Sequence, residues 1–276
     1  MKRFSWAMLA LALAVGLAFV GCGGGLDETF DVSTAADLKA AFASITAAGD
    51  YLININAPLT VTEDNHLTIA GANVTIKGAS ASTTITSSTN GIFWAEAGKI
   101  TLENLRITGG AGLVATGTGT MEIKNGLSLI GNFGSVGNGL FVGNTATFIM
   151  LGGTVEGFND GLASASWREF VGKITISGGT IRNCGVGVSL RDNTSDSTLT
   201  ISGGDISGNQ AGIVINGNNN TVTISGGKVS VSGSDGVAIY VAGGSGHTVR
   251  KTGGTVSGGT PPYYIENGAQ ATVTGL

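Results

Sequence analysis

A short phrase with two consecutive glycines recurs five times in the second half of the chain. Its second glycines are Gly153, Gly179, Gly204, Gly227 and Gly254, so successive copies are spaced by 26, 25, 23 and 27 residues. A repeat of about 25 residues is one supersecondary unit, which cannot bury its apolar side alone. We therefore expect the units to stack on one another around a shared core.

Fainter copies of the phrase extend the repeat towards the N-terminus. They begin at Leu67, Ile100 and Glu122. The alignment gives eight turns in all, and it places Ala72 and Leu105, 33 residues apart, at equivalent positions. This predicts that the largest early insertion lies between those two turns.

Each repeat has the pattern of three short strands. Ile174 and Ile176 point to one side of a strand while Thr175 and Ser177 point to the other. After the double glycine come further apolar pairs separated by Asn and Gly, which tolerate the left-handed backbone of a turn. A triangular coil of three strands needs roughly 20–25 residues, which agrees with the observed spacing.

This pattern resembles that of the right-handed parallel β-helix superfamily, often called pectin-lyase-like. The resemblance covers residues 33–276 and implies an all-β domain, a right-handed parallel β-helix (solenoid) of about eight coils. Ahead of the repeats, Thr34 and Asp37 form a capping-box pattern, and apolar residues at helical spacing follow as far as a stop at Gly49. We expect an amphipathic capping helix within residues 33–49 to cover the open edge of the first coil.

The composition indicates a folded domain that does not bind nucleic acid. The 276 residues include 48 Gly and only 3 Pro, which indicates many tight turns. Charged residues make up 12 % and hydrophobic residues 42 %, the opposite of a disordered composition. The net charge is −4, and −6 without Lys2 and Arg3, so the chain lacks the basic surface that a phosphate backbone requires.

The first 21 residues have the pattern of a secretory signal peptide. Lys2 and Arg3 precede an uncharged, mostly apolar run that is short for a membrane-spanning helix. The run ends in Gly21 and Cys22, and it resembles a bacterial lipoprotein signal, although the two residues before Gly21 depart from the usual small side chains.

The lipoprotein resemblance implies that Cys22 is lipidated. It would carry a diacylglyceryl thioether and a further acyl chain such as palmitate, and two or more chains anchor a protein stably to a membrane. Residues 22–32 would then be the lipidated cysteine and a flexible tether. The implied location is a bacterial cell envelope, at the outer membrane or cell surface rather than the inner membrane. The alternative is an ordinary secretory signal in which Cys22 occurs by chance.

Segments that break the repeat contain the candidate site residues. One turn holds Asp192 and Asp196, whose carboxylates are the kind of ligand that calcium prefers, although a solvated turn uses the same residue types. An insertion holds Trp167 and Phe170, and an exposed aromatic ring there would stack on a sugar; the alternative is that the pair covers the core. Cys184 is expected to be a small buried side chain.

The sequence shows no gathered set of catalytic residues. We therefore expect a non-enzymatic envelope protein without a cofactor, whose repetitive surface binds a glycan or another protein. Two alternatives stay open, because fold alone does not decide function. One is a calcium-dependent polysaccharide lyase or glycoside hydrolase that uses Asp192 and Asp196, and the other is a purely structural envelope protein.

Overall fold

The computed structural model describes residues 26–89, 91–110, 112–131, 137–164 and 169–276. The expected signal peptide, the lipidation candidate Cys22 and the ligand candidate Trp167 lie outside the described residues. Within the described ranges, no helix is both long enough and apolar enough to span a membrane.

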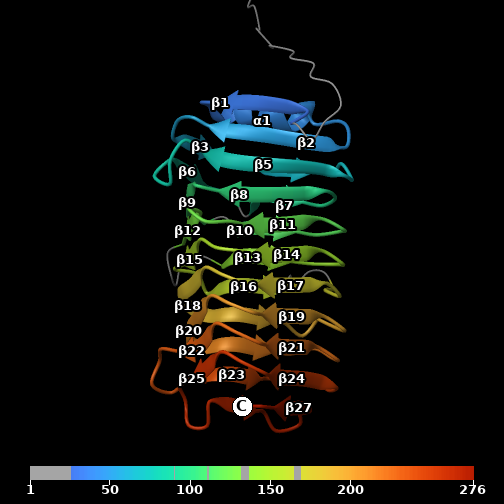
Figure 1. The fold of residues 1–276 in the computed structure, drawn as a ribbon, viewed down its shortest axis with the longest axis vertical. Coiled ribbons are helices and arrows are strands. Elements are labelled where there is room, and N and C mark those ends of the chain that lie inside the picture. The colour runs from blue at the N-terminus through green and yellow to red at the C-terminus, as the bar shows by residue number, and fades with distance from the viewer. Residues whose placement is uncertain (1–25, 90, 111, 132–136, 165–168) are drawn as a thin grey trace, which may run out of the picture.

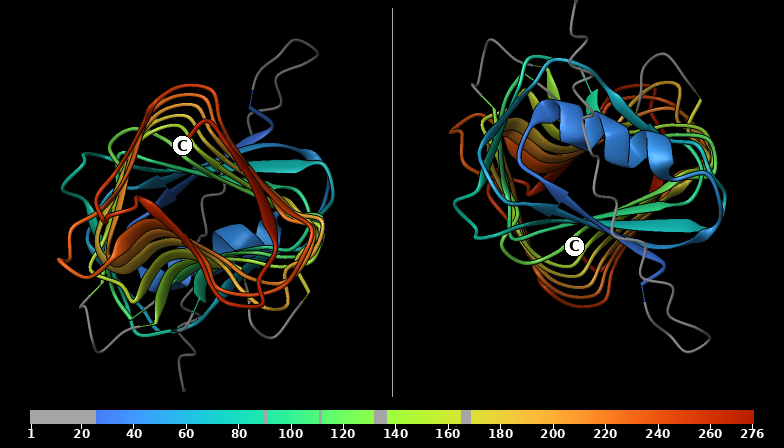
Figure 2. Two further views of the ribbon diagram at one scale, coloured as in Figure 1. Left: turned by 90° about the horizontal axis from the view of Figure 1, so that it is seen from below. Right: turned by 90° about the horizontal axis from the view of Figure 1, so that it is seen from above.

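The chain winds into a right-handed parallel β-helix of about nine coils (Figure 1), which confirms the predicted fold class. The strands pair in parallel from coil to coil, and the hand is the one that parallel crossovers adopt almost without exception. Seen along its axis, the coil is a rounded triangle (Figure 2). The sequence predicted about eight coils, because the coils near the N-terminus lack the double glycine and are harder to align.

One face of the triangle is a sheet of eleven strands, here called the first sheet. It consists of β1 (Glu28–Val32), β2 (Gly49–Ile55), β5 (Ala72–Gly78), β8 (Lys99–Glu103), β11 (Thr120–Ile123), β14 (Thr147–Met150), β17 (Lys173–Ile176), β19 (Thr198–Ile201), β21 (Thr221–Ile224), β24 (His247–Lys251) and β27 (Ala271–Thr274).

The other sixteen strands make up two faces, which are joined because β18 (Thr180–Leu190) and β20 (Asp205–Ile215) continue through the corner between them. The second face holds the first halves of those two strands with β3 (Leu59–Val61), β6 (Thr84–Ser87), β9 (Arg106–Gly109), β12 (Ser128–Ile130), β15 (Thr154–Glu156), β22 (Lys228–Val231) and β25 (Thr255–Ser257). The third face holds their second halves with β4 (Asn65–Leu67), β7 (Gly91–Ala95), β10 (Gly112–Ala115), β13 (Asn138–Val142), β16 (Asp160–Ser164), β23 (Val237–Val241) and β26 (Tyr263–Ile265).

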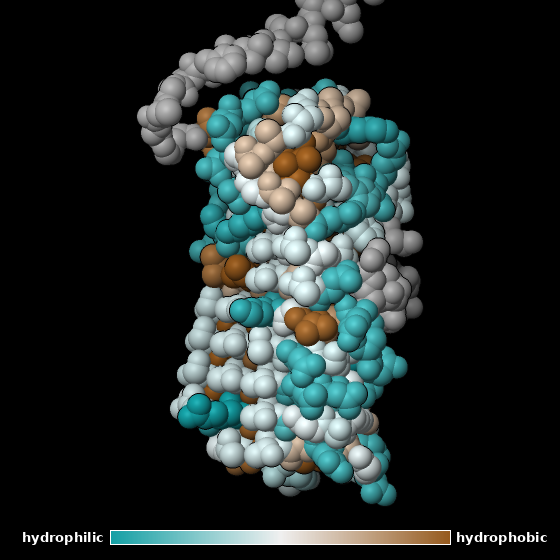
Figure 3. Space-filling view, turned by 90° about the vertical axis from the view of Figure 1, so that its right-hand side faces the viewer, coloured by the Kyte–Doolittle hydropathy of each residue, from teal (hydrophilic) through white to brown (hydrophobic). Residues whose placement is uncertain are grey.

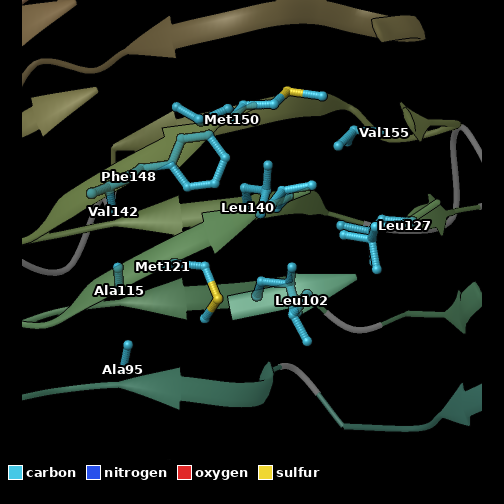
Figure 4. Close-up of a cluster of buried hydrophobic side chains, with 14 of the residues drawn as sticks. Ala95, Leu102, Ala115, Met121, Leu127, Leu140, Val142, Phe148, Met150 and Val155 are labelled. Atoms are coloured by element: carbon cyan, nitrogen blue, oxygen red, sulfur yellow. The ribbon is translucent and has the colours of Figure 1, made fainter. Parts of the chain in front are cut away.

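The core is a continuous apolar column inside the coils. Ile174 pairs with Phe148 in the preceding coil and with Leu199 in the next, and all three side chains are buried. Thr175, beside Ile174, lies on the outer surface, as the alternation predicts. Figure 4 shows a section of the column, in which side chains from all three faces fill the interior. Because each side chain stacks on its equivalent one coil away, every coil is stabilised mainly by its contacts with the coils before and after it.

The repeat alignment was wrong at its first copy. Leu67 ends β4 on the third face, whereas the first sheet of that coil is β5, in which Val74 pairs with Ile100. The expected 33-residue gap is therefore an artefact of the alignment. The short strand that ends at Leu67 has the same buried–exposed–buried pattern as a first-sheet strand, so a copy without its double glycine could not be assigned to the correct face.

The predicted helix is α1 (Ala35–Ser44), which lies across the N-terminal end of the coils (Figure 2, right). Thr34 is its N-cap, and the side chains of Thr34 and Asp37 each accept a backbone N–H of the other residue, which confirms the capping box. Leu38 and Phe42 are buried, and the Phe42 ring stacks on Phe93 with 5.9 Å between centroids. The helix thus closes the apolar column.

Two predicted boundaries near this cap were wrong. The helix ends at Ser44 rather than at Gly49, which instead begins β2. Residues 28–32, expected to be part of a flexible tether, form β1 and pair with β2 from Glu28 to Val32. A strand ahead of the helix covers the edge of β2, which would otherwise expose unpaired backbone groups.

The double glycines form the corner between the first sheet and the second face. The second glycine of each pair has a left-handed backbone, with φ of 83° at Gly179, 81° at Gly204 and 70° at Gly227. A Cβ built on Gly227 would lie 2.6 Å from the carbonyl carbon of Gly203, in the coil before. The corner therefore requires glycine twice over, for its backbone conformation and for the close approach of the next coil.

Gly227→Ala should lower the free energy of unfolding by about 2 kcal/mol or more, because left-handed strain and steric overlap add. Gly268→Ala is the matched control, since Gly268 also has a positive φ but nothing lies within 4 Å of its Cβ position. Chemical denaturation of both variants checks this. If both variants lose the same free energy of unfolding, steric overlap at the corner contributes nothing to the loss in Gly227→Ala.

Asp37 should make the helix cap sensitive to acid. Hydrogen bonds from the Ser33 backbone and the Thr34 side chain lower the pKa of Asp37 below its ordinary 3.8. Its contribution to stability is therefore present above the unfolded pKa and is lost as the pH falls through the lowered folded pKa.

Thermal unfolding from about pH 6 to about pH 2 tests this prediction. The wild-type chain should be more stable than Asp37→Asn at the upper end, and the two melting temperatures should converge at the acid end. A constant difference would contradict the assignment.

Candidate functional site

The third face carries one row of side chains at a single register position, which alternates with the residues that enter the core. Strand pairing aligns one residue from each coil, and their neighbours Phe93, Ile213 and Ile239 point inwards and are buried. The row contains, in order, His66, Trp94, Val114, Phe141, Ala163, Ser189, Val214, Tyr240 and Tyr264. Aromatic side chains therefore lie at both ends of the row, and Phe141 is a further aromatic residue near its middle. Val114, Ala163 and Ser189, which also lie between the two ends, are buried.

At the C-terminal end, Tyr240 and Tyr264 lie side by side on β23 and β26. Their ring centroids are 5.9 Å apart, and the ring planes are inclined by 31°. Tyr264 is 47 % exposed, whereas Tyr240 is partly buried. Both rings border an open groove of about 480 Å³, whose other lining residues include Val214, Gln210 and Asp235. The groove thus combines an apolar, aromatic floor with a few polar groups, as is common in small-ligand sites.

A carboxylate fixes the inner tyrosine. The Tyr240 hydroxyl donates a hydrogen bond of 2.5 Å to Glu266 Oε2. This hydrogen bond, with smaller contributions from burial and from the charge of Glu266, raises the pKa of Tyr240 above 10.0. The phenol is therefore neutral at physiological pH, and its ring is held in place from its hydroxyl end.

The charge at this groove is acidic. Asp235 lines it, and Glu266 lies on the Tyr240 hydroxyl. Among the described lining residues there is no Lys, Arg or His. The groove is therefore suited to uncharged ligands or to ligands with an amino group, and it disfavours a ligand carboxylate because like charges repel.

Glu266→Gln should lower the pKa of Tyr240 towards 10.0, because the neutral amide accepts the hydrogen bond less strongly and carries no charge. A pH titration of the tyrosine ring resonances measures this. Glu103→Gln, on the first sheet, is the matched control and should leave Tyr240 unchanged. If the pKa of Tyr240 is the same in Glu266→Gln as in the wild type, the assignment of Glu266 as the cause of the raised pKa is wrong.

The calcium candidates Asp192 and Asp196 both lie exposed in a turn. Asp196 adopts a left-handed backbone with φ of 50°, and its N–H donates to the carbonyl of Asn218 in the next coil. The neighbouring Arg191 donates to Asp160, at 2.7 Å, on the preceding coil. In the described ranges, no three acidic, His or Cys side chains gather to hold a metal ion. The aspartates therefore stay candidates without a third ligand in the described chain.

The aromatic candidate Phe170 is fully buried, at 0 % exposure, so its proposed contact with a ligand is wrong. Its backbone bridges Asn144 in one coil and Thr194 in the next, and this stacking turns the ring into the core. Phe170 therefore follows the alternative, in which the insertion covers the core.

Cys184 is a buried free thiol, as predicted. Burial raises its pKa above the ordinary value, although hydrogen bonds from the backbone of Phe158 and Gly157 partly offset this. The thiol donates to the carbonyl of Arg182 at 3.2 Å. A protonated, enclosed thiol is a poor nucleophile, so Cys184 is part of the core.

A second group of charged side chains lies on the first sheet. Lys99 Nζ lies 2.6 Å from Glu122, and Lys124 lies 3.8 Å from Glu122 and 3.9 Å from Glu103. Glu122 is largely buried between the two lysines. Because these carboxylates and lysines pair across adjacent coils, the group forms an ion-pair ladder that offsets its own charges.

Sequence reasoning missed the tyrosine groove. In the sequence, Tyr263 and Tyr264 lie in a segment that breaks the repeat, and nothing local distinguishes them as site residues. The structure shows that Tyr263 pairs with Ile239, whereas Tyr264 pairs with Tyr240 on the outside. The available signal was an aromatic residue at the same position in two successive coils, and it becomes visible only when the strand register is known.

Comparisons with known proteins add little to this geometry. No protein-family description matches the chain, and no curated protein matches it. Among solved structures, the chain is similar to an alginate lyase from Paenibacillus sp. str. FPU-7, with 13 % sequence identity and a TM-score of 0.39. The match covers 88 % of this chain and 97 % of the other. A likeness this weak does not bear on activity.

Proposed function

We propose that this chain is a non-enzymatic glycan-binding protein of a bacterial envelope, and that it binds its ligand in the Tyr240–Tyr264 groove. The observation that carries the proposal is the pair of adjacent tyrosine rings over an open groove on the outer surface. Exposed aromatic rings in a concave site with few polar groups are a common basis for ligand binding.

The chemistry of a sugar ring fits this arrangement. A pyranose presents C–H groups on its face, which pack against the electron-rich face of an aromatic ring. Its hydroxyl groups point outwards from the ring, where Gln210 and Asp235 offer hydrogen-bond partners. The hydrogen bond from Tyr240 to Glu266 holds one ring before the ligand arrives, which reduces the entropy lost on binding.

The acidic charge narrows the class of glycan. Asp235 and Glu266 would repel the carboxylates of a polyuronate, whereas neutral hexoses meet no such penalty. An amino sugar would gain an attraction from the same two side chains. We therefore propose neutral or amino sugars as the ligand class.

The proposal includes the lipid anchor at Cys22. Because β1 begins at Glu28, an anchor at Cys22 would hold the helix-capped end of the rod close to the membrane. The tyrosine groove belongs to the last coils, on the order of 30 Å further along the rod. This arrangement would present the groove away from the bilayer, where a glycan is accessible.

The test measures retention of the full chain, in detergent, on immobilised neutral, amino and acidic polysaccharides. Tyr264→Ala should weaken retention on the neutral or amino polymers by about tenfold or more, the size expected for loss of an aromatic anchor. Leu151→Ala is the matched control, because Leu151 is a 44 % exposed apolar residue outside the groove.

Two outcomes would contradict the proposal. One is equal affinity for the wild type and for folded Tyr264→Ala. The other is the release of new chain ends from a polysaccharide that stops when calcium is chelated, which would favour the lyase or hydrolase alternative and Asp192 with Asp196.

A further inference from the structure

The N-terminal end of the same row carries a second aromatic pair. His66 and Trp94 occupy paired positions on β4 and β7, and their rings stack with 5.2 Å between centroids and 19° between planes. The His66 side chain is 43 % exposed, and its Nδ1 lies 2.6 Å from Glu96 Oε1. The pair therefore faces solvent, with a carboxylate beside it.

A specific local arrangement holds the Trp94 indole in place. Trp94 Nε1 donates to the carbonyl of Gly91 on its own strand, at 2.7 Å. A Cβ built on Gly91 would lie 2.4 Å from Trp94 Nε1, so any other residue at this position would displace the ring. Glycine inside a strand commonly marks such a close approach.

A polar groove adjoins the pair. It has a volume of about 430 Å³, and Glu96 lines it together with Thr116, Thr118, Asn144 and Thr145. Hydroxyl, amide and carboxylate groups at this density suit a ligand with many hydroxyl groups. No Lys or Arg is among the described lining residues, so this site matches the tyrosine groove in charge as well as in aromatic character.

The two aromatic sites lie on one straight line along the rod. Tyr240 and Trp94 share a register position, and their strands β7 and β23 are separated on the third face by β10, β13, β16, β18 and β20. Parallel strands are about 4.8 Å apart, which places the two sites about 30 Å from each other. Between them the row carries no charged side chain, and Val114, Ala163 and Ser189 are buried. A ligand that spans both sites would therefore contact the aromatic pairs at its two ends rather than the row between them.

We propose that the His66–Trp94 site is a second sugar-binding station, and that the ligand is one unbranched polysaccharide long enough to span the two stations. This inference rests on the proposed function, because it gives the same ligand a second point of attachment. A chain held at both stations binds the second site intramolecularly, which raises the overall affinity above that of either site. A trisaccharide is too short to reach both stations, about 30 Å apart.

The experiment uses calorimetry of the full chain in detergent with two neutral probes, cellotriose and a soluble, unbranched mixed-linkage β-glucan. The wild type should bind two cellotriose molecules. Trp94→Ala should bind one, with the affinity of the remaining station unchanged, and its affinity for the glucan should fall about tenfold or more. His66→Ala, an exposed substitution that leaves the indole in place, should weaken the same station to a smaller extent.

The variants separate the two proposals. If Tyr264→Ala weakens binding while Trp94→Ala and His66→Ala do not, the second station is refuted and the proposed function stands. If the wild type binds one cellotriose and gains nothing from the longer glucan, the second station is likewise refuted. If the wild type binds neither probe, both proposals fail for unbranched neutral glucans.

Discussion

The structure depends on parallel backbone hydrogen bonds that join every coil to the next in register. Those bonds form only if successive coils approach equally closely all the way round, including at the corners where the chain changes direction. Gly179, Gly204 and Gly227 make this possible at one corner, where the carbonyl groups of the preceding coil leave no room for a Cβ. The stacked core, the flat outer faces and the alignment of surface residues all follow from that contact.

Much of the fold could be predicted, because the glycine corner appears in the sequence as a repeated double glycine. The spacing of the double glycines predicted the coil, and the alternation around Ile174 predicted which side chains enter the core. The prediction was weaker near the N-terminus, since the early coils lack the glycine pair and Leu67 fits the pattern of any face. Strand β1 was missed for a similar reason, because five residues next to an apparent tether carry little periodic signal.

The candidate site was much harder to predict, because it depends on register rather than on local pattern. Trp94 and Tyr240 are distant in the sequence, and they share a line only after every intervening strand has been aligned. Conversely, the sequence left open whether Phe170 contacts a ligand or covers the core, because it lies in an insertion; in the structure its backbone joins the stack and its ring enters the core. Loop composition therefore said little about which aromatic rings face solvent.

A row built from one residue per coil also has a consequence for how such a protein can change. Duplicating or deleting a whole coil between β7 and β23 would move the two aromatic pairs by one inter-strand distance, about 4.8 Å, without disturbing either pair. The distance between the two aromatic pairs therefore changes only in steps of one coil. A substitution within a coil, by contrast, changes only the side chain that this coil contributes to the row. In evolutionary terms, the distance between the two aromatic pairs and the ligand chemistry of each pair can therefore be selected separately.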